Sequence, residues 1–199
     1  MNLTAITEER EVVVKHFIDS ISVLRYLPEK ARTLIDVGTG AGFPGIPLKI
    51  VRNGLQVTLL DSLEKRVRFL DAIISENSLA DIQAMHGRAE DFAREKPHRE
   101  RYDIGIARAV ASLPVLCEYI LPFVRVGGLF IAMKGSEVQK ELEEAGKAIS
   151  ILGGMVKKVD HFMLPFVPME RHVISIEKVR QTPTQYPRKS GKPTKSPIQ

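Results

Sequence analysis

The chain has 199 residues, of which 44% are hydrophobic, and a formal net charge of +5, which suits one domain with a packed core and excludes a disordered chain. No apolar run reaches the roughly 18 residues that a membrane span needs, and no secretory signal opens the sequence. Because Cys117 is the single cysteine, intramolecular disulfides are excluded, and we expect a soluble, cytoplasmic protein that has no membrane partner and is a monomer.

The N-terminal segment, residues 1–28, is predicted to be helical. Apolar residues recur at helical spacing from Glu8 to Leu27, and Pro28 ends the pattern. We expect this helix to pack on the rest of the domain through one apolar stripe. The stripe consists of Val13, Phe17, Ile21 and Leu24.

Short apolar runs then alternate with helical patterns along the chain. Strands are predicted at residues 33–37, 56–60, 82–86, 102–107 and 128–134. Helices are predicted at residues 46–52, 63–77, 89–95, 113–124 and 137–152. Strict alternation of strand and helix implies a parallel sheet with helices on both faces.

The alternation stops after Gly153 and Gly154, where two strands, residues 155–164 and 172–179, follow each other without a helix. Two consecutive strands form a hairpin, so one of them runs antiparallel to the others. The predicted fold is therefore α/β and Rossmann-like: a mostly parallel, doubly wound sheet with an antiparallel C-terminal strand, in one domain that spans residues 1–179.

A glycine-rich loop that begins at Gly38 follows the first predicted strand. Gly40, Gly42 and Gly45 satisfy G-x-G-x-x-G, in which the missing Cβ atoms let the backbone approach a ligand. The loop alone leaves open an NAD or FAD site, and also a turn without ligand. Asp36 argues against a dinucleotide, because a carboxylate repels pyrophosphate. S-adenosylmethionine carries an ammonium and a sulfonium and no phosphate, so it tolerates this acid.

Two further positions suit a nucleoside. Asp61 closes the second predicted strand 21 residues after Gly40, where a carboxylate can accept hydrogen bonds from ribose hydroxyls. It is equally placed to be the N-cap of the next helix. Ala89 and Glu90 follow the third predicted strand, where an adenine edge would meet a backbone N–H or a carboxylate. The alternative for this pair is an ordinary helix start.

Five stretches of the sequence resemble the bacterial ribosomal small-subunit methyltransferase G family, also called glucose-inhibited division protein B. They are DVGTGAGFPGIPL, LLDSLEKRVRFL, GRAED, ARAVASL and YPRKSGKPTKSPI. GFPGIPL and YPRK are more specific than the glycine loop, and the resemblance covers nearly the whole chain. Members of the family usually carry a further helical segment ahead of the stretch that resembles MNLTAIT, with which this chain begins.

The resemblance implies a class I methyltransferase fold and methyl transfer from S-adenosylmethionine to N7 of one guanine in 16S rRNA, free or in the small ribosomal subunit. It implies cofactor contacts at Gly38, Phe43, Ala89, Glu90 and Arg108. Since guanine N7 has an available lone pair, we expect no general base and no metal. Two other enzyme classes remain as alternatives. A small-molecule methyltransferase would share Asp61 and the glycine loop, and a nicotinamide oxidoreductase would share the glycine loop alone.

Three positions in the domain are candidates for the RNA side of the site. Arg108 follows the fourth predicted strand, beside the expected base, with a surface ion pair as its alternative. His16 shares one helical face with Asp19 and Ser20, which would form a polar rim for RNA, although such a histidine is more often a core or cap residue. Lys134 ends the fifth predicted strand, near the expected mouth of the pocket. It is predicted to contact phosphate there, with a solvated side chain as the alternative. Cys117 is predicted to be a buried, inert thiol.

Residues 180–199 are predicted to form a basic tail. Residues 178–199 carry six lysines and arginines and no acid, which leaves the rest of the chain close to neutral. Prolines keep such a segment extended, so that Arg188, Lys189 and Lys192 can follow a phosphate backbone. A solubilising tail without a specific partner is the alternative.

Overall fold

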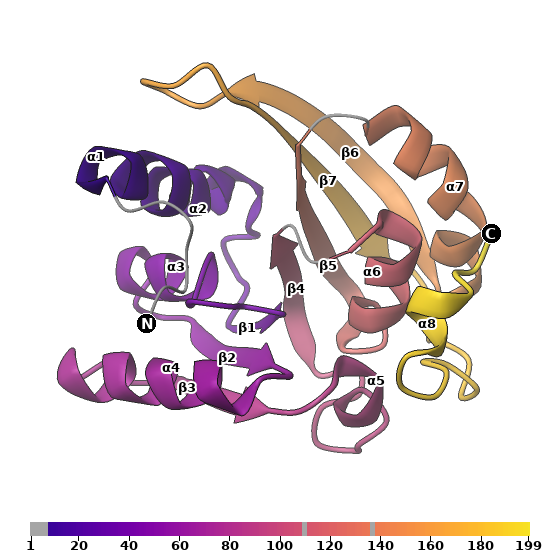
Figure 1. Cartoon of the computed structure of the whole chain (residues 1–199). Coiled ribbons are helices and arrows are strands. Elements are labelled where there is room, and N and C mark those ends of the chain that lie inside the picture. Colours follow the sequence, from indigo (N-terminus) through magenta and orange to yellow (C-terminus); the bar gives the residue numbers. More distant parts are fainter. Residues whose placement is uncertain (1–7, 109–110, 136–137) are drawn as a thin grey trace.

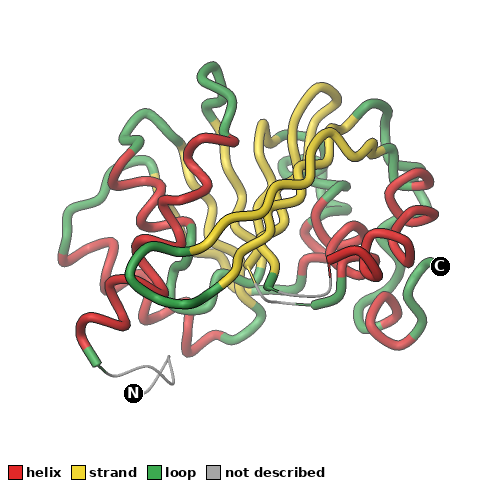
Figure 2. Tube along the Cα trace, turned by 90° about the horizontal axis from the view of Figure 1, so that it is seen from above, coloured by secondary structure: helices red, strands yellow, loops and turns green. Residues whose placement is uncertain are grey.

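The computed structural model describes residues 8–108, 111–135 and 138–199, which form one seven-stranded sheet with helices on both faces (Figures 1 and 2). The strand order is β3-β2-β1-β4-β5-β7-β6. The strands are β1 Thr33–Val37, β2 Gln56–Asp61, β3 Ile82–His86, β4 Tyr102–Arg108, β5 Val124–Lys134, β6 Gly154–Met163 and β7 Glu170–Lys178.

Strands β1 to β5 pair in parallel, and β7 runs antiparallel to both β5 and β6. The predicted class I fold with an antiparallel C-terminal strand is therefore confirmed. In this order the carboxyl ends of β1, β2, β3 and β4 lie next to one another at one edge of the sheet. Ligands of open α/β sheets bind at such an edge.

Helices cover the two faces of the sheet with separate apolar cores. On one face α3 and α4 pack through Leu48 and Leu70, while on the other α6 and α7 pack through Leu116 and Ala148. The helices are α3 Gly45–Val51, α4 Glu64–Glu76, α5 Ala89–Phe92, α6 Leu113–Ile120, α7 Val138–Ile151 and α8 Lys192–Lys195. Position 137, predicted to open α7, lies outside the described residues. In the described ranges no helix combines the length and the apolar character needed to cross a bilayer.

The N-terminal segment is helical from residue 9, but its turns are irregular. It consists of α1 Glu9–Val12, the π-helix η1 Val13–Ile18, α2 Asp19–Ile21 and the 3₁₀-helix η2 Ser22–Tyr26. The predicted apolar stripe is wrong in phase, because Val13 and Phe17 are 45% and 41% exposed. A π-helix bonds residue i to i+5, so the periodicity of 3.6 residues no longer holds across η1. Asp19 and Ser20 face the interior instead.

Residues 180–199, which we name the C-terminal strap, fold back onto the domain beside α6 (Figure 1). Arg188 grips the buried carboxylate of Glu118 on α6, with Nη2 2.6 Å from Oε2 and Nε 2.9 Å from Oε1. Ile198 joins the apolar core. The prediction of an extended basic tail is therefore wrong, because the sequence could not reveal that Arg188 has a buried partner. Lys189 and Lys192 are exposed.

The start of the C-terminal strap is held by two cations, the buried Lys178 and the partly buried Arg99. The ammonium of Lys178 donates to the carbonyl of Leu121 and to the hydroxyl of Thr182, 2.8 Å away, and pairs with Glu100 at 3.0 Å. Burial lowers the pKa of Lys178 to about 8. Arg99 donates to the backbone carbonyl of Thr182 at 2.8 Å. These bonds fix the direction in which the chain leaves β7.

We predict that Arg188→Met destabilises the fold by roughly 3 kcal/mol, because it leaves the buried carboxylate of Glu118 without its counter-ion. The neighbouring substitution Lys189→Met removes an exposed cation and should change the free energy of unfolding by less than about 0.5 kcal/mol. Urea denaturation at pH 7 measures both. Equal, small effects would mean that the strap is not held by Arg188.

Candidate active site

The loop after β1 is shaped by its glycines and by Asp36. Gly38 and Gly40 have φ of +71° and +62°, a region that glycine enters without strain. A Cβ on Gly45 would overlap the side chain of Leu59, so this glycine lets α3 pack closely on the sheet. Asp36 holds the loop through Oδ2, which accepts from Thr39 Oγ1 at 2.7 Å and from the Gly45 amide at 2.9 Å.

The other oxygen of Asp36, Oδ1, is buried and has no hydrogen-bond partner within the described part of the chain. Burial raises the pKa of this carboxyl to about 6, against an ordinary value of 3.8. Arg108 opposes that rise and Asp61 adds to it, so both charges lie within electrostatic reach. A buried carboxylate oxygen without a donor is costly, and a cation or donor supplied by a ligand would relieve that cost.

Asp61 ties the loop to the second strand. Its Oδ2 accepts from the Gly40 amide and its Oδ1 from the Leu63 amide, both at 2.9 Å. Because α4 begins only at Glu64 with Leu63 as its N-cap, the prediction that Asp61 caps this helix is wrong. Arg66 lies over the carboxylate, with Nη1 3.3 Å from Oδ2. Oδ2 thus accepts from two donors, while Oδ1 accepts from one and has a second lone pair for a further donor.

A cavity of about 240 Å³ lies at the carboxyl ends of β1, β2 and β3. It is lined by Val37, Gly38, Leu60, Ser62, Gly87, Arg88, Ala89, Glu90, Ala111, Tyr119 and Thr194. Three predicted cofactor residues, Gly38, Ala89 and Glu90, thus meet at one cavity. Gly40 and Asp61 are bonded to each other, and neither is among its lining residues. Sequence reasoning missed Tyr119, which lies outside the quoted motifs, and Thr194, which lies in YPRKSGKPTKSPI within the segment predicted to be an extended tail.

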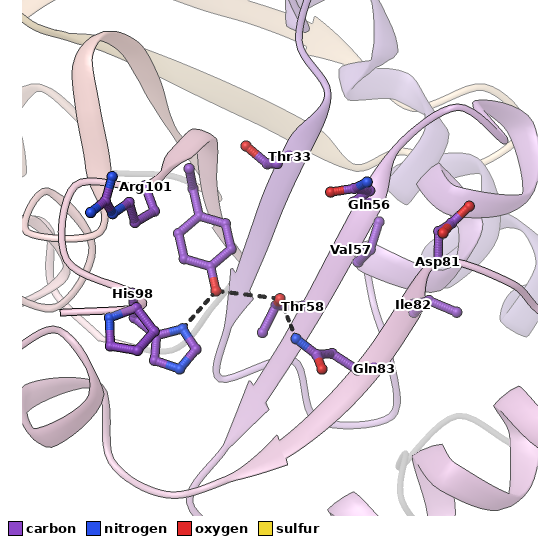
Figure 3. A pocket seen from close by; sticks show the side chains of 11 residues that line it. Thr33, Gln56, Val57, Thr58, Asp81, Ile82, Gln83, His98 and Arg101 are labelled. Carbon is purple, nitrogen blue, oxygen red and sulfur yellow. Dashed lines mark hydrogen bonds between the residues drawn. The ribbon is translucent and has the colours of Figure 1, made fainter. Parts of the chain in front are cut away.

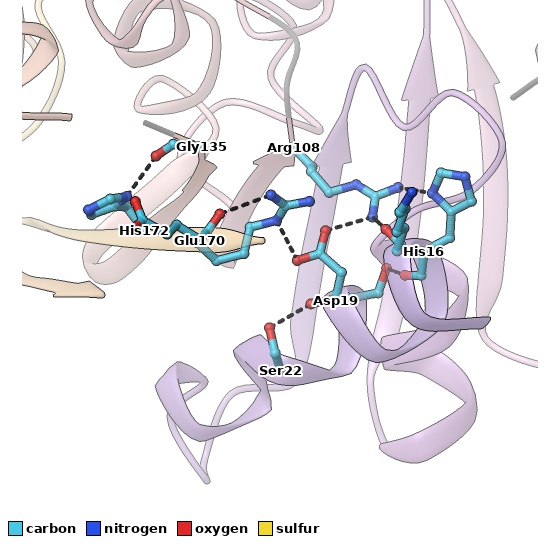
Figure 4. Close-up of polar contacts among 10 residues, drawn as sticks. His16, Asp19, Ser22, Arg108, Gly135, Glu170 and His172 are labelled. Atoms are coloured by element: carbon cyan, nitrogen blue, oxygen red, sulfur yellow. Dashed lines mark hydrogen bonds and ion pairs between the residues drawn. The ribbon is translucent and has the colours of Figure 1, made fainter. Parts of the chain in front are cut away.

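Arg108 lies instead beside the N-terminal helices (Figure 4), and Phe43 contacts the rings of His16 and Phe17 there. Arg108 Nη1 is 3.1 Å from Asp19 Oδ2, and its guanidinium carbon lies 5.3 Å from the centre of the Phe43 ring. Asp19 is fully buried, and its other oxygen pairs with Arg171 Nε at 2.9 Å. The surface ion pair considered for Arg108 is therefore an ion pair with a buried carboxylate. Arg171 was missed because it is 152 residues from Asp19 in the sequence.

His16 stacks on Phe43, with ring centres 5.0 Å apart. Burial, assisted by the positive charge of Arg108, lowers the pKa of His16 below its usual 6.5, so the ring is neutral at pH 7. Arg108 Nη2 lies 3.3 Å from His16 Nδ1, and a guanidinium can only donate. The ring proton therefore belongs on Nε2, which is buried and has no partner among the described residues. With Asp19 and Ser20 buried, the predicted polar rim reduces to His16.

A second cavity, of about 360 Å³, opens beside His16 and Arg108. It is lined by Lys15, His16, Asp19, Arg108, Met133, Lys134, Gly135, Met169 and Arg171. Lys134 is only 8% exposed, because its ammonium donates to the Ala111 carbonyl at 2.6 Å and pairs with Glu141 at 2.7 Å. The solvated side chain considered for Lys134 is therefore wrong, while its predicted phosphate contact stays a prediction. Cys117 is buried, as predicted, and burial raises the pKa of its thiol.

A third hollow, shown in Figure 3, lies at the opposite edge of the sheet. It is lined by the first residues of four strands, Thr33, Gln56, Ile82 and Tyr102. His98 bonds the hydroxyl of Tyr102 there at 2.9 Å. Because amino ends of parallel strands meet at this edge, it lies away from the glycine loop and from both cavities above.

The donor set at the carboxyl edge fits S-adenosylmethionine. A Cβ on Gly40 would project into open space, so the backbone there is free to meet a ligand. The unpartnered Oδ1 of Asp36 offers negative charge to a cationic ligand. The adjoining cavity carries the backbone of Gly38 and Ala89 and the buried carboxylate of Glu90, groups that suit a neutral nucleoside and would repel a pyrophosphate.

Comparison with known proteins gives a consistent result. A family model described as rRNA small subunit methyltransferase G matches residues 1–174. The chain is 58% identical to the ribosomal RNA small subunit methyltransferase G of Acetivibrio thermocellus, with 100% of this chain and 81% of the relative covered. It is 54% identical to that of Geobacillus kaustophilus, with 100% and 84% covered.

Among solved structures, the fold is similar to that of TYW2 from M. jannaschii in complex with AdoMet. The TM-score is 0.64 at 14% identity, and 90% of this chain and 81% of that chain are covered. It is also similar to geranyl diphosphate C-methyltransferase from Streptomyces coelicolor, with a TM-score of 0.62 at 13% identity, covering 80% and 78%. At these identities the likeness concerns the fold alone.

We predict that Asp36→Asn changes how stability depends on pH. Since the folded-state pKa of Asp36, about 6, exceeds its ordinary value of 3.8, wild-type stability falls as pH rises through this interval. Asparagine has no such proton to lose, so the free energy of unfolding of the variant minus that of wild type should grow by about 2 kcal/mol between pH 4 and 7. Denaturant unfolding across this range measures the difference. Parallel curves would contradict an elevated pKa at this carboxyl.

Proposed function

The chain belongs to the rRNA small subunit methyltransferase G family, and from that premise we propose that it methylates N7 of a guanine in 16S rRNA. It is an enzyme that uses S-adenosylmethionine and acts on ribosomal RNA. We further propose which residues bind the cofactor and which bind the guanine. It rests most on one observation: His16 and Arg108 line the same cavity at the carboxyl edge of the sheet, with Arg108 Nη2 3.3 Å from His16 Nδ1. The ring proton then belongs on Nε2, which has no hydrogen-bond partner among the described residues.

The chain's part in the reaction begins with holding the cofactor. When bound, S-adenosylmethionine supplies a methyl group on a positively charged sulfur. Gly38, Ala89 and Glu90 would surround its adenosine part, and Asp61 would accept from the ribose. Asp36 would offer the charge of its free oxygen to the cationic end. These groups position and polarise, and none of them needs to move a proton.

The cavity beside His16 suits a guanine taken out of its stack. Enzymes that modify a base generally need it extruded. The major-groove edge of guanine presents two acceptors, O6 and N7. The Nε2–H of His16 and the guanidinium of Arg108 are donors, which would hold O6 and leave the N7 lone pair free. Because that lone pair is available, the residues contribute alignment, which is worth about 7 kcal/mol or more when reacting groups are well oriented.

Contacts with the rest of the RNA would come from exposed cations at the same end of the sheet. Lys189 and Lys192 remain candidates, since both are exposed on the C-terminal strap. Arg188 is not one, because Glu118 occupies its guanidinium. We propose that the enzyme acts as a monomer in the cytoplasm on 16S rRNA or the small subunit.

A cofactor titration tests the first half of the proposal. Calorimetry with S-adenosylhomocysteine should give clear binding, while NAD gives none. Asp61→Ala should weaken binding at least tenfold, as expected when hydroxyls lose a charged acceptor. Glu64→Ala, an exposed acid on the following helix, is the control and should leave affinity unchanged. Binding heat with NAD and none with S-adenosylhomocysteine would contradict the cofactor assignment.

His16→Phe tests the guanine side. Phenylalanine keeps the stacking on Phe43 but removes the N–H, so transfer of labelled methyl groups to small-subunit RNA should fall at least tenfold while cofactor affinity stays the same. His98→Phe, at the opposite edge of the sheet, is the matched control and should keep full activity. If His16→Phe also kept full activity, His16 would be a packing residue.

A further inference from the structure

The cavity of about 240 Å³ at the carboxyl ends of β1, β2 and β3, which we name the adenosine cavity, has one wall that neither the glycine loop nor the strand ends supply. Tyr119 on α6 and Thr194 on α8 line it opposite Gly38 and Ala89. The Tyr119 hydroxyl lies 2.7 Å from Thr194 Oγ1, so the two side chains are bonded to each other. One side of the cavity is therefore built by the C-terminal strap.

The strap is also bonded to a predicted cofactor residue. Glu90 is 3% exposed, and its Oε1 accepts from the amide of Gly191 at 2.8 Å. The next residue, Asp91, accepts from the hydroxyl of Ser190 at 3.0 Å. The carboxylate that faces the nucleoside cavity thus holds the strap with one oxygen and leaves the other for a ligand.

The wall is held in place by the ion pair between Arg188 and Glu118. Glu118 precedes Tyr119 on α6. Its carboxylate accepts from Nη2 of Arg188 at 2.6 Å and from the backbone N–H of Arg188 at 2.7 Å. Pro193, which precedes the cavity-lining Thr194, is buried. The strap is thus bonded to Glu90 and to Glu118 before a ligand binds. Because the wall is already ordered, ligand binding does not lose free energy to ordering it, and the affinity is higher.

We propose that the C-terminal strap is part of the cofactor site, and that Tyr119 and Thr194 position it against the adenosine end. This inference rests on the cofactor assignment above. By reciprocity of coupled equilibria, a docked strap raises cofactor affinity and bound cofactor holds the strap docked. Tyr119 and Thr194 are positioning residues, since their bond acts through the placement of the wall.

Hydrogen–deuterium exchange of the full chain, with and without saturating S-adenosylhomocysteine, tests the coupling. We expect exchange to slow in the glycine loop, residues 38–45, and about tenfold in residues 190–196. Slowing in the loop without slowing in the strap would overturn the inference and leave the cofactor site intact. No slowing in either segment would remove the cofactor site, and the strap inference with it.

A double-mutant cycle supplies the residue-level test. Tyr119→Phe and Thr194→Val each remove one side of the same bond, so each should weaken S-adenosylhomocysteine binding about three- to tenfold, and the double variant no more than either alone. Thr184→Val, exposed elsewhere on the strap, is the matched control. Thermal unfolding of each variant checks that the fold is retained. Unchanged affinity in both single variants would overturn the positioning role.

Discussion

The carboxyl edge of this sheet is organised around one buried charge, the carboxylate of Asp19. It is fully buried and held between two guanidinium groups, Arg108 at the end of β4 and Arg171 in β7. A buried carboxylate that loses a partner costs several kcal/mol, so the N-terminal helices, β4 and β7 must keep their relative positions. That constraint places His16 against Phe43 and gives the second cavity its walls.

The two cavities divide the chemistry between them. The smaller one is lined by backbone, by Glu90 and by the strap, which suits a nucleoside. The larger one is lined by His16 and Arg108, whose N–H groups would suit the acceptor edge of a guanine. Between them lies the glycine loop, held by the carboxylates of Asp36 and Asp61. In the proposed reaction the residues at this edge serve alignment, in keeping with a nucleophile that needs no deprotonation.

The sequence predicted whatever depends on local pattern. Strand and helix order, the hairpin after Gly154 and the glycine loop were all correct, because alternation and glycine spacing are local signals. What it could not predict depends on partners distant in the chain. Arg188 was predicted to lie on an extended tail, yet its guanidinium binds the buried carboxylate of Glu118, 70 residues away in the sequence. The π-helix of η1, which moved the predicted apolar stripe toward solvent, likewise has no clear signature in residue type. The assigned roles of the cofactor and RNA residues remain predictions.

The most direct test of the central claim is a map of N7-methylguanine in 16S rRNA from cells that lack this gene and from the same cells expressing this chain. We expect one modified guanine to disappear when the gene is absent and to return, at the same position, when the chain is expressed. A methylation pattern that stays the same in both strains, or a restored methyl group on a different atom or a different RNA, would contradict the proposed activity.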